Sequence, residues 1–272
     1  MQSLIIQFGC FEREGARHVP TPQARMAGRD SGVHTSIVSG PARREFEQQH
    51  ITVPRSARYA LLGSFGVDLS EVWIVCHGHG QLAARFLTRF LPLERGDRLI
   101  VAPEALSRYY LIAPTSGAHS PGSAVGATWM TSEDREADIE DYVTYLDCVY
   151  EHVFSLVNRN SVRLWVLGFS QGVATVTRWI TRSKIDADRV VLWSGSLPPE
   201  LTRNDAAALT AHAPLTVVSG RRDEYATRER VTAQRDMLTR LGLTFEMMSF
   251  DGGHDIDATT LLGIAAGSVA AA

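Results

Sequence analysis

Residues 162–175 read Val-Arg-Leu-Trp-Val-Leu-Gly-Phe-Ser-Gln-Gly-Val-Ala-Thr, an apolar run that ends in a serine flanked by glycines. The run has the length and composition of a buried strand, and a helix-compatible sequence follows Ser170 directly. The G-x-S-x-G pattern of Gly168, Ser170 and Gly172 between a strand and a helix predicts a sharp turn that exposes the serine hydroxyl. Side chains larger than glycine two positions from the serine would crowd such a turn. Ser170 is therefore the candidate nucleophile.

A serine nucleophile needs a histidine to accept its proton and an acid to orient that histidine. Asp223 and Glu224 follow one strand-like run downstream of Ser170, and His254 follows the next. The chemistry of open α/β sheets gathers at the carboxyl ends of their strands, so we expect these side chains to converge on Ser170. We assign His254 as the base and Asp223 as the acid, with Glu224 as the alternative acid.

From residue 50 onward, strand-like and helix-like segments alternate. The strand-like segments are 51–62, 72–76, 98–102, 163–167, 190–193, 215–219 and 244–249, and the helical ones are 81–91, 133–158, 172–182, 228–241 and 258–269. This alternation predicts the α/β class, with a mostly parallel central sheet and helices on both faces. Because Pro54 interrupts the first segment, we expect an edge hairpin strand or two short strands there.

A further group of residues, His77-Gly78-His79-Gly80, follows the strand-like segment 72–76. An H-x-H pair after a strand can open a binuclear zinc site. Such a site normally continues with further Asp and His ligands, whereas Gln81 and Leu82 follow here and the sequence holds no second group with ligand spacing. We therefore expect no metal and no organic cofactor.

These motifs together resemble the phospholipase/carboxylesterase branch of the serine α/β-hydrolases, which includes acyl-protein thioesterases and small bacterial esterases. The resemblance covers about residues 51–262, and its most specific parts are the glutamine inside the elbow and Ser194-Gly195-Ser196-Leu197-Pro198. Further matching pieces are Val101-Ala102-Pro103-Glu104, Gly220-Arg221-Arg222-Asp223, Gly252-Gly253-His254 and Trp129. Leu82 departs from the family, which often has Asp there. The resemblance implies an α/β-hydrolase fold.

The resemblance also implies how the site would stabilise charge. In α/β-hydrolases, the oxyanion of the reacting carbonyl is held by one backbone N–H from the loop after an early strand and one from the residue after the nucleophile. These donors correspond to His79, with Gly80 as the alternative, and Gln171.

The segment between residue 102 and the long predicted helix is the candidate substrate pocket. Aromatic and large apolar side chains lie there among Gly and Ser residues: Tyr109, Tyr110, Leu111, Ile112, Trp129 and Met130. Loops at strand ends often shape pockets, and apolar walls suit an acyl or alcohol group. The alternative is that these side chains fill a small core beneath a long loop.

Composition limits the partners. A net charge of −3 and a pI near 6.3 give no electrostatic basis for binding nucleic acid. No apolar stretch is long enough to form an integral membrane segment. The first residues, Met1-Gln2-Ser3-Leu4-Ile5-Ile6, lack the basic lead and full apolar core of a signal peptide, so we expect a cytoplasmic protein.

The sequence divides at about residue 50. Residues 1–49 have few large apolar side chains and no clear period, which predicts a weakly packed or flexible N-terminal extension. An alternative is that they are upstream sequence before a start at Met26. Residues 50–272 are predicted to form the catalytic domain.

The expected function is a serine carboxylesterase that hydrolyses small to medium acyl esters, with a small-molecule ester as substrate. One alternative is a thioesterase or lysophospholipase for long acyl chains, which would share every catalytic residue and differ in its pocket. Another is a hydrolase fold retained as a non-catalytic binding module. The intact serine, acid, histidine and donor loop argue against the binding module.

Overall fold

The computed structural model describes residues 48–66, 68–112, 119–183 and 185–267. By its internal contacts the chain divides into two units, Met1–Arg55 and Ser56–Ala272, and every element below belongs to the second unit. Residues 1–47, including Met26, lie outside the described residues. The prediction of an extension over residues 1–49 therefore stays a prediction.

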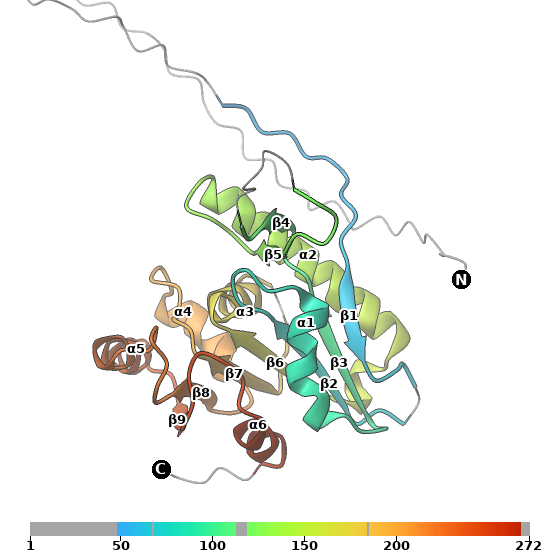
Figure 1. The fold of residues 1–272 in the computed structure, drawn as a ribbon. Helices are drawn as coiled ribbons and strands as arrows, with labels where there is room; N and C mark the ends of the chain where they lie inside the picture. Colours follow the sequence, from blue (N-terminus) through green and yellow to red (C-terminus); the bar gives the residue numbers. More distant parts are fainter. Residues whose placement is uncertain (1–47, 67, 113–118, 184, 268–272) are drawn as a thin grey trace, which may run out of the picture. The chain divides into compact units, whose positions relative to one another are not determined.

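Seven strands of the described chain form one sheet in the order β1-β3-β2-β6-β7-β8-β9 (Figure 1). These strands are β1 (Tyr59–Leu62), β2 (Glu71–Cys76), β3 (Arg98–Pro103), β6 (Arg163–Phe169), β7 (Arg189–Trp193), β8 (Leu215–Gly220) and β9 (Phe245–Phe250). All pairs are parallel except β1 with β3, which is antiparallel at one edge. The predicted parallel sheet is confirmed.

Helices cover both faces of the sheet. The longer helices are α2 (Arg135–Leu156), α3 (Gln171–Arg182), α5 (Arg228–Leu241) and α6 (Ala258–Ala265), and α1 (Ala83–Leu87) leads into the 3-10 helix η1 (Thr88–Leu93). Alternate residues of β2 point to opposite faces of the sheet. Val72 and Ile74 belong to the core cluster that includes residues of α2, α3 and α5, whereas Trp73 and Val75 belong to the cluster that includes residues of α1, η1 and α6. No helix among the described residues has the length and apolar character needed to cross a membrane.

The main differences between the structure and the sequence-based expectation lie in three segments. Residues 51–58 form no strand, and the first strand is confined to Tyr59–Leu62, which is the part that pairs with β3. A small antiparallel sheet joins β4 (Ser107–Tyr110) to β5 (Val125–Thr128), where no strand was expected. The short helix α4 (Arg203–Ala206), followed by the 3-10 helix η3 (Ala207–Thr210), was also not predicted. Strands and helices of about four residues depend on tertiary partners and leave little periodic signal in a sequence.

Candidate active site

Ser170 occupies the turn between β6 and α3 with φ 54° and ψ −117°. This region of backbone space is strained for a residue with a side chain, and such strain is concentrated at functional sites. The turn is closely packed. A Cβ on Gly172 would lie 2.2 Å from the Cys76 carbonyl oxygen, and one on Gly195 would lie 2.2 Å from the Ser170 carbonyl oxygen. A Cβ on Gly168 would lie 2.3 Å from the Gly172 carbonyl oxygen. A larger side chain at either glycine of the motif would therefore clash with the backbone.

Asp223 and His254 approach each other from the ends of β8 and β9. Nδ1 of His254 lies 2.8 Å from Oδ2 of Asp223, the aspartate side chain is fully buried, and the histidine side chain is 20% exposed. The loops after β8 and β9 meet so closely that a Cβ on Gly220 would lie 2.4 Å from the Gly252 carbonyl oxygen and 2.5 Å from that of Gly253. The carboxylate accepts the Nδ1 proton, which leaves Nε2 of the neutral ring as a hydrogen-bond acceptor.

The surroundings of Asp223 keep its carboxylate ionised. Burial would raise the pKa of Asp223, but hydrogen bonds from the His254 ring and from the Tyr225 N–H outweigh burial and hold the pKa below its usual value. Glu224, the alternative acid, is exposed, and the structure gives it no hydrogen bond to His254. The geometry therefore brings together His254 and Asp223 rather than Glu224.

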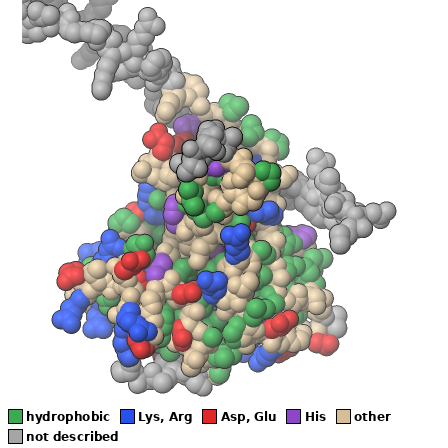
Figure 2. All heavy atoms as spheres, viewed as in Figure 1, with side chains coloured by type: hydrophobic (Ala, Val, Ile, Leu, Met, Phe, Trp, Pro, Cys, Tyr) green, Lys and Arg blue, Asp and Glu red, His purple; other side chains and the backbone are tan. Residues whose placement is uncertain are grey.

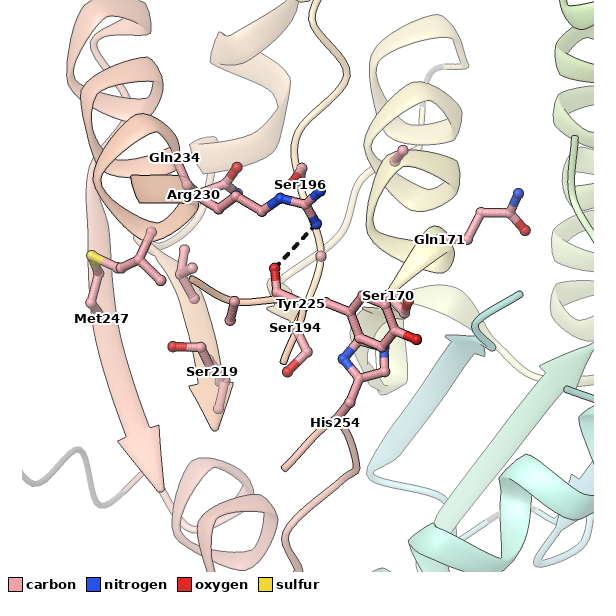
Figure 3. Close-up of a pocket in the computed structure, with 16 residues that line it drawn as sticks. Ser170, Gln171, Ser194, Ser196, Ser219, Tyr225, Arg230, Gln234, Met247 and His254 are labelled. Carbon is pink, nitrogen blue, oxygen red and sulfur yellow. Dashed lines mark hydrogen bonds between the residues drawn. The ribbon is translucent and has the colours of Figure 1, made fainter. Parts of the chain in front are cut away.

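Ser170 and His254 line the same pocket (Figure 3). The imidazole lies between two aromatic rings, with centroid distances of 4.9 Å to Phe169 and 4.8 Å to Tyr225. Within the described residues no hydrogen bond joins the Ser170 hydroxyl to the His254 ring. Catalytic hydrogen bonds are commonly long in the absence of substrate and tighten when it binds.

Two backbone N–H groups near Ser170 have no protein acceptor among the described residues. One belongs to Gln171, the first residue of α3, where helix geometry leaves the N–H unpaired. The other belongs to His79. The loop that contains His79 lies so close to the serine that a Cβ on Gly78 would be 3.0 Å from the Ser170 Cβ. The Gly80 N–H, the alternative donor, is already bonded to the Ala127 carbonyl oxygen at 2.8 Å.

The side chain of Gln171 ties the start of α3 to the segment after β5. Its Oε1 accepts the Trp129 N–H at 3.1 Å, and its Nε2 donates to the Met130 carbonyl oxygen at 2.8 Å. A carboxamide offers both the acceptor and the donor that these two backbone groups require. This explains in physical terms why glutamine suits the position after the serine.

The two histidines of the early loop have different environments. Burial lowers the pKa of His77 to about 4, and its ring has a backbone partner at each nitrogen: Nδ1 donates to the Gly78 carbonyl oxygen and Nε2 accepts the Ala105 N–H. Neither nitrogen of His77 is therefore left to bind a metal. His79 is exposed, and its Nε2 lies 2.6 Å from the Tyr109 hydroxyl.

The pocket at Ser170 has a volume of about 320 Å³ and extends from the elbow past the end of β7 toward α5. Tyr109, Tyr110, Trp129 and Met130 do not line it. Trp129 is 2% exposed and donates its indole N–H to the His77 carbonyl oxygen, so it packs in the core, which is the alternative raised above. Tyr110 is 49% exposed and stacks on His119.

Several other residues that line this pocket were not assigned to it from the sequence. They include Ser194 and Ser196 after β7, which entered only as part of the family motif, and Arg230 and Gln234 on α5. The serines directly follow a predicted strand, which is a usable signal. Arg230 and Gln234 are four residues apart on one helix face, but the local sequence does not distinguish a pair that faces a pocket from a pair that faces solvent.

Comparisons with known proteins agree with this architecture. The family profile described as Phospholipase/Carboxylesterase matches residues 67–266. Among solved structures, acyl-protein thioesterase 2 from Zea mays is 18% identical, with 78% of this chain and 97% of that chain covered and a TM-score of 0.54. A carboxylesterase from Mesorhizobium loti is also 18% identical, covering 78% of this chain and 95% of that one, with a TM-score of 0.57. At these identities the structural similarity shows the fold. No curated protein shows significant sequence similarity to the chain.

Proposed function

Because the chain belongs to the phospholipase/carboxylesterase family, we propose that it is a serine carboxylesterase that hydrolyses small to medium acyl esters through an acyl-enzyme intermediate. One observation carries this proposal: a histidine that donates to a buried carboxylate shares a pocket with a partly buried serine in a strained turn. These are the parts that nucleophilic acyl transfer needs.

In the first step, the Ser170 oxygen attacks the ester carbonyl carbon while Nε2 of His254 takes the hydroxyl proton. The ionised Asp223 carboxylate holds the ring in the required tautomer and stabilises the imidazolium that forms. His254 then gives its proton to the departing alcohol oxygen. Water attacks the acyl-enzyme in the second step, with His254 again as base, and the acid is released as Ser170 regains its proton. The reaction requires no metal or organic cofactor.

Negative charge develops on the carbonyl oxygen in each step. The N–H groups of His79 and Gln171, which have no acceptor in the described part of the chain, are the donors that would bind this oxyanion. Donors fixed in place before the reaction need no reorganisation, and losing one typically lowers turnover about a hundredfold or more.

The size of the pocket supports small to medium acyl groups. Its volume of about 320 Å³ is near the lower end of the range of roughly 300–1,000 Å³ that is usual for ligand pockets. A long-chain thioesterase or lysophospholipase would use the same catalytic residues with a longer acyl pocket.

The test is hydrolysis of nitrophenyl esters from acetate to palmitate by the wild-type protein and by Ser170→Ala. We expect a wild-type optimum at short or medium chains, and a loss of turnover in Ser170→Ala of at least about a thousandfold because the nucleophile is absent. Ser155→Ala, which removes an exposed hydroxyl on α2, is the matched control.

An optimum at long chains would instead favour the thioesterase or lysophospholipase alternative. Wild-type rates in Ser170→Ala would exclude Ser170 as the nucleophile. Failure of a fluorophosphonate probe to label Ser170, together with no ester turnover, would favour a non-catalytic binding module.

A further inference from the structure

Arg230 places a positive charge in the pocket that contains the nucleophile. It lies in the first turn of α5 and lines the pocket together with Ser170 (Figure 3). Its guanidinium donates one hydrogen bond, at 3.3 Å, to the Tyr225 carbonyl oxygen. In the part of the chain that the structure describes, no carboxylate forms an ion pair with Arg230. Its acidic neighbours in sequence, Glu224 and Glu229, do not line the pocket.

Several other arginines of this chain do have carboxylate partners. Arg98 pairs with Glu71, and Arg222 pairs with Asp251. By contrast, α5 carries four arginines and two carboxylates, and Figure 2 shows basic side chains gathered over this helix. The positive N-terminal end of the helix dipole adds to the local field. A pocket that contains a guanidinium attracts anions even on a protein with a net charge of −3.

Gln234, one helical turn after Arg230, lines the same pocket. Its Oε1 accepts the Leu197 N–H at 3.1 Å, which fixes the orientation of the amide. Its Nε2 is buried and has no partner among the described residues. This nitrogen has almost no accessible surface, so Gln234 shapes the wall beside Arg230 rather than supplying a free donor.

The pocket also has apolar lining, including Val218 and Met247. The structure therefore places the nucleophile, apolar surface and the Arg230 guanidinium along one pocket. A guanidinium matches the planar, two-oxygen geometry of a carboxylate.

From this arrangement we infer that the enzyme selects esters that carry a second, free carboxylate group, and that Arg230 binds it. The inference rests on the proposed esterase function. The reacting carbonyl lies at Ser170, the aliphatic linker contacts the apolar walls, and the free carboxylate contacts α5. Hydrolysis proceeds as described above, with the free carboxylate unchanged.

The test compares two pairs of esters that differ only in charge. The first pair is nitrophenyl adipate, with a free carboxylate on the acyl chain, and nitrophenyl methyl adipate, in which that end is neutral. The second pair is the butyrate ester of 4-hydroxybenzoate, with the carboxylate on the alcohol side, and its methyl ester. For each pair the measured quantity is the ratio of kcat/KM for the charged ester to kcat/KM for the neutral ester.

We expect the wild-type protein to favour the charged member of one pair, and Arg230→Gln to lower that ratio by about tenfold or more because it removes a charge-assisted hydrogen bond. Arg230→Lys should keep part of the preference, since it retains the charge but not the planar fork. Arg228→Gln removes the same charge two residues earlier, outside this pocket, and should change the ratio by no more than about twofold because Arg228 does not line the pocket and its charge is screened over the longer distance.

Equal ratios in the wild-type protein and Arg230→Gln for both pairs would overturn the inference, as would an equal loss in Arg228→Gln. In either case, Ser170-dependent turnover of the neutral esters would leave the proposed function intact. Absence of turnover for every ester would overturn the proposed function and this inference together.

Discussion

At the scale of single residues, the adjacent acids Asp223 and Glu224 have different surroundings. Both follow β8, but only the Asp223 carboxylate is buried and hydrogen-bonded to His254. Its pKa is held below the usual value, so the carboxylate is ionised at neutral pH. Glu224 is exposed to solvent.

We predict that Asp223→Asn lowers kcat by about a hundredfold to ten-thousandfold, since an amide cannot stabilise the imidazolium or enforce the required tautomer. Glu224→Gln is the matched control and should change kcat little. Steady-state kinetics on one short-chain ester measures both variants. A larger loss in Glu224→Gln than in Asp223→Asn would reverse the assignment of the acid.

At the scale of elements, the start of α3 is held against the end of β2 with no spare space. The first turn of the helix approaches the sheet so closely that a Cβ on Gly172 would meet the carbonyl oxygens of Cys76 and His77 at 2.2 and 2.9 Å. Backbone atoms cannot yield as a flexible side chain can. The His79 loop also lies close to Ser170, since a Cβ on Gly78 would be 3.0 Å from the Ser170 Cβ.

We predict that Gly172→Ala lowers the free energy of unfolding by on the order of 1–3 kcal/mol or more, because the added methyl group overpacks this contact. Turnover should fall as well, since the clash displaces the elbow. Gly96→Ala is the control, because a Cβ there would meet nothing within 4 Å. Urea unfolding of both variants gives the comparison, and equal stabilities would show that the helix start can shift without penalty.

At the scale of the whole molecule, Glu200 connects three parts of the chain. This residue follows β7 and pairs with Arg178 of α3 at 2.6 Å and with Arg135 of α2 at 3.1 Å. Burial would raise the pKa of Glu200, but the hydrogen bond from Arg178 and the charges of Arg178 and Arg135 lower it from 4.5 to about 2. Arg178 is 6% exposed, so this carboxylate neutralises a nearly buried charge.

A carboxylate whose pKa is depressed in the folded state stabilises the fold above its unfolded pKa, and this contribution is lost as pH falls through the folded pKa. We therefore predict that the stabilisation from Glu200 is complete above pH 4.5 and disappears between pH 4.5 and about 2. Thermal unfolding of Glu200→Gln should show a lower Tm than wild type at pH 7 and a shrinking difference toward pH 2. Glu140→Gln, which changes an exposed glutamate of α2, is the control. A constant difference across this range would rule out the ion pair as its source.

The α/β class, most long helices and the main strands were predictable because each follows from a pattern within about 5 to 20 consecutive residues. Helix α5 matched its predicted bounds, residues 228–241. The β4–β5 sheet was not predictable, since each strand has four residues and they are separated by a long segment. The 51–62 segment was predicted too long, because strand-forming residues become a strand only where a partner strand exists.

The positions of Ser170, Asp223 and His254 follow from the sequence alone, because each lies just beyond a strand and the ends of parallel strands share one edge of the sheet. Which acid meets the histidine, and which N–H groups are unpaired, depends on sub-ångström packing of loops that no local pattern encodes. The pocket is decided by tertiary structure for the same reason. Ser196 and Arg230 line it together although 34 positions separate them in the sequence, and only the folding of α5 against the sheet makes them neighbours.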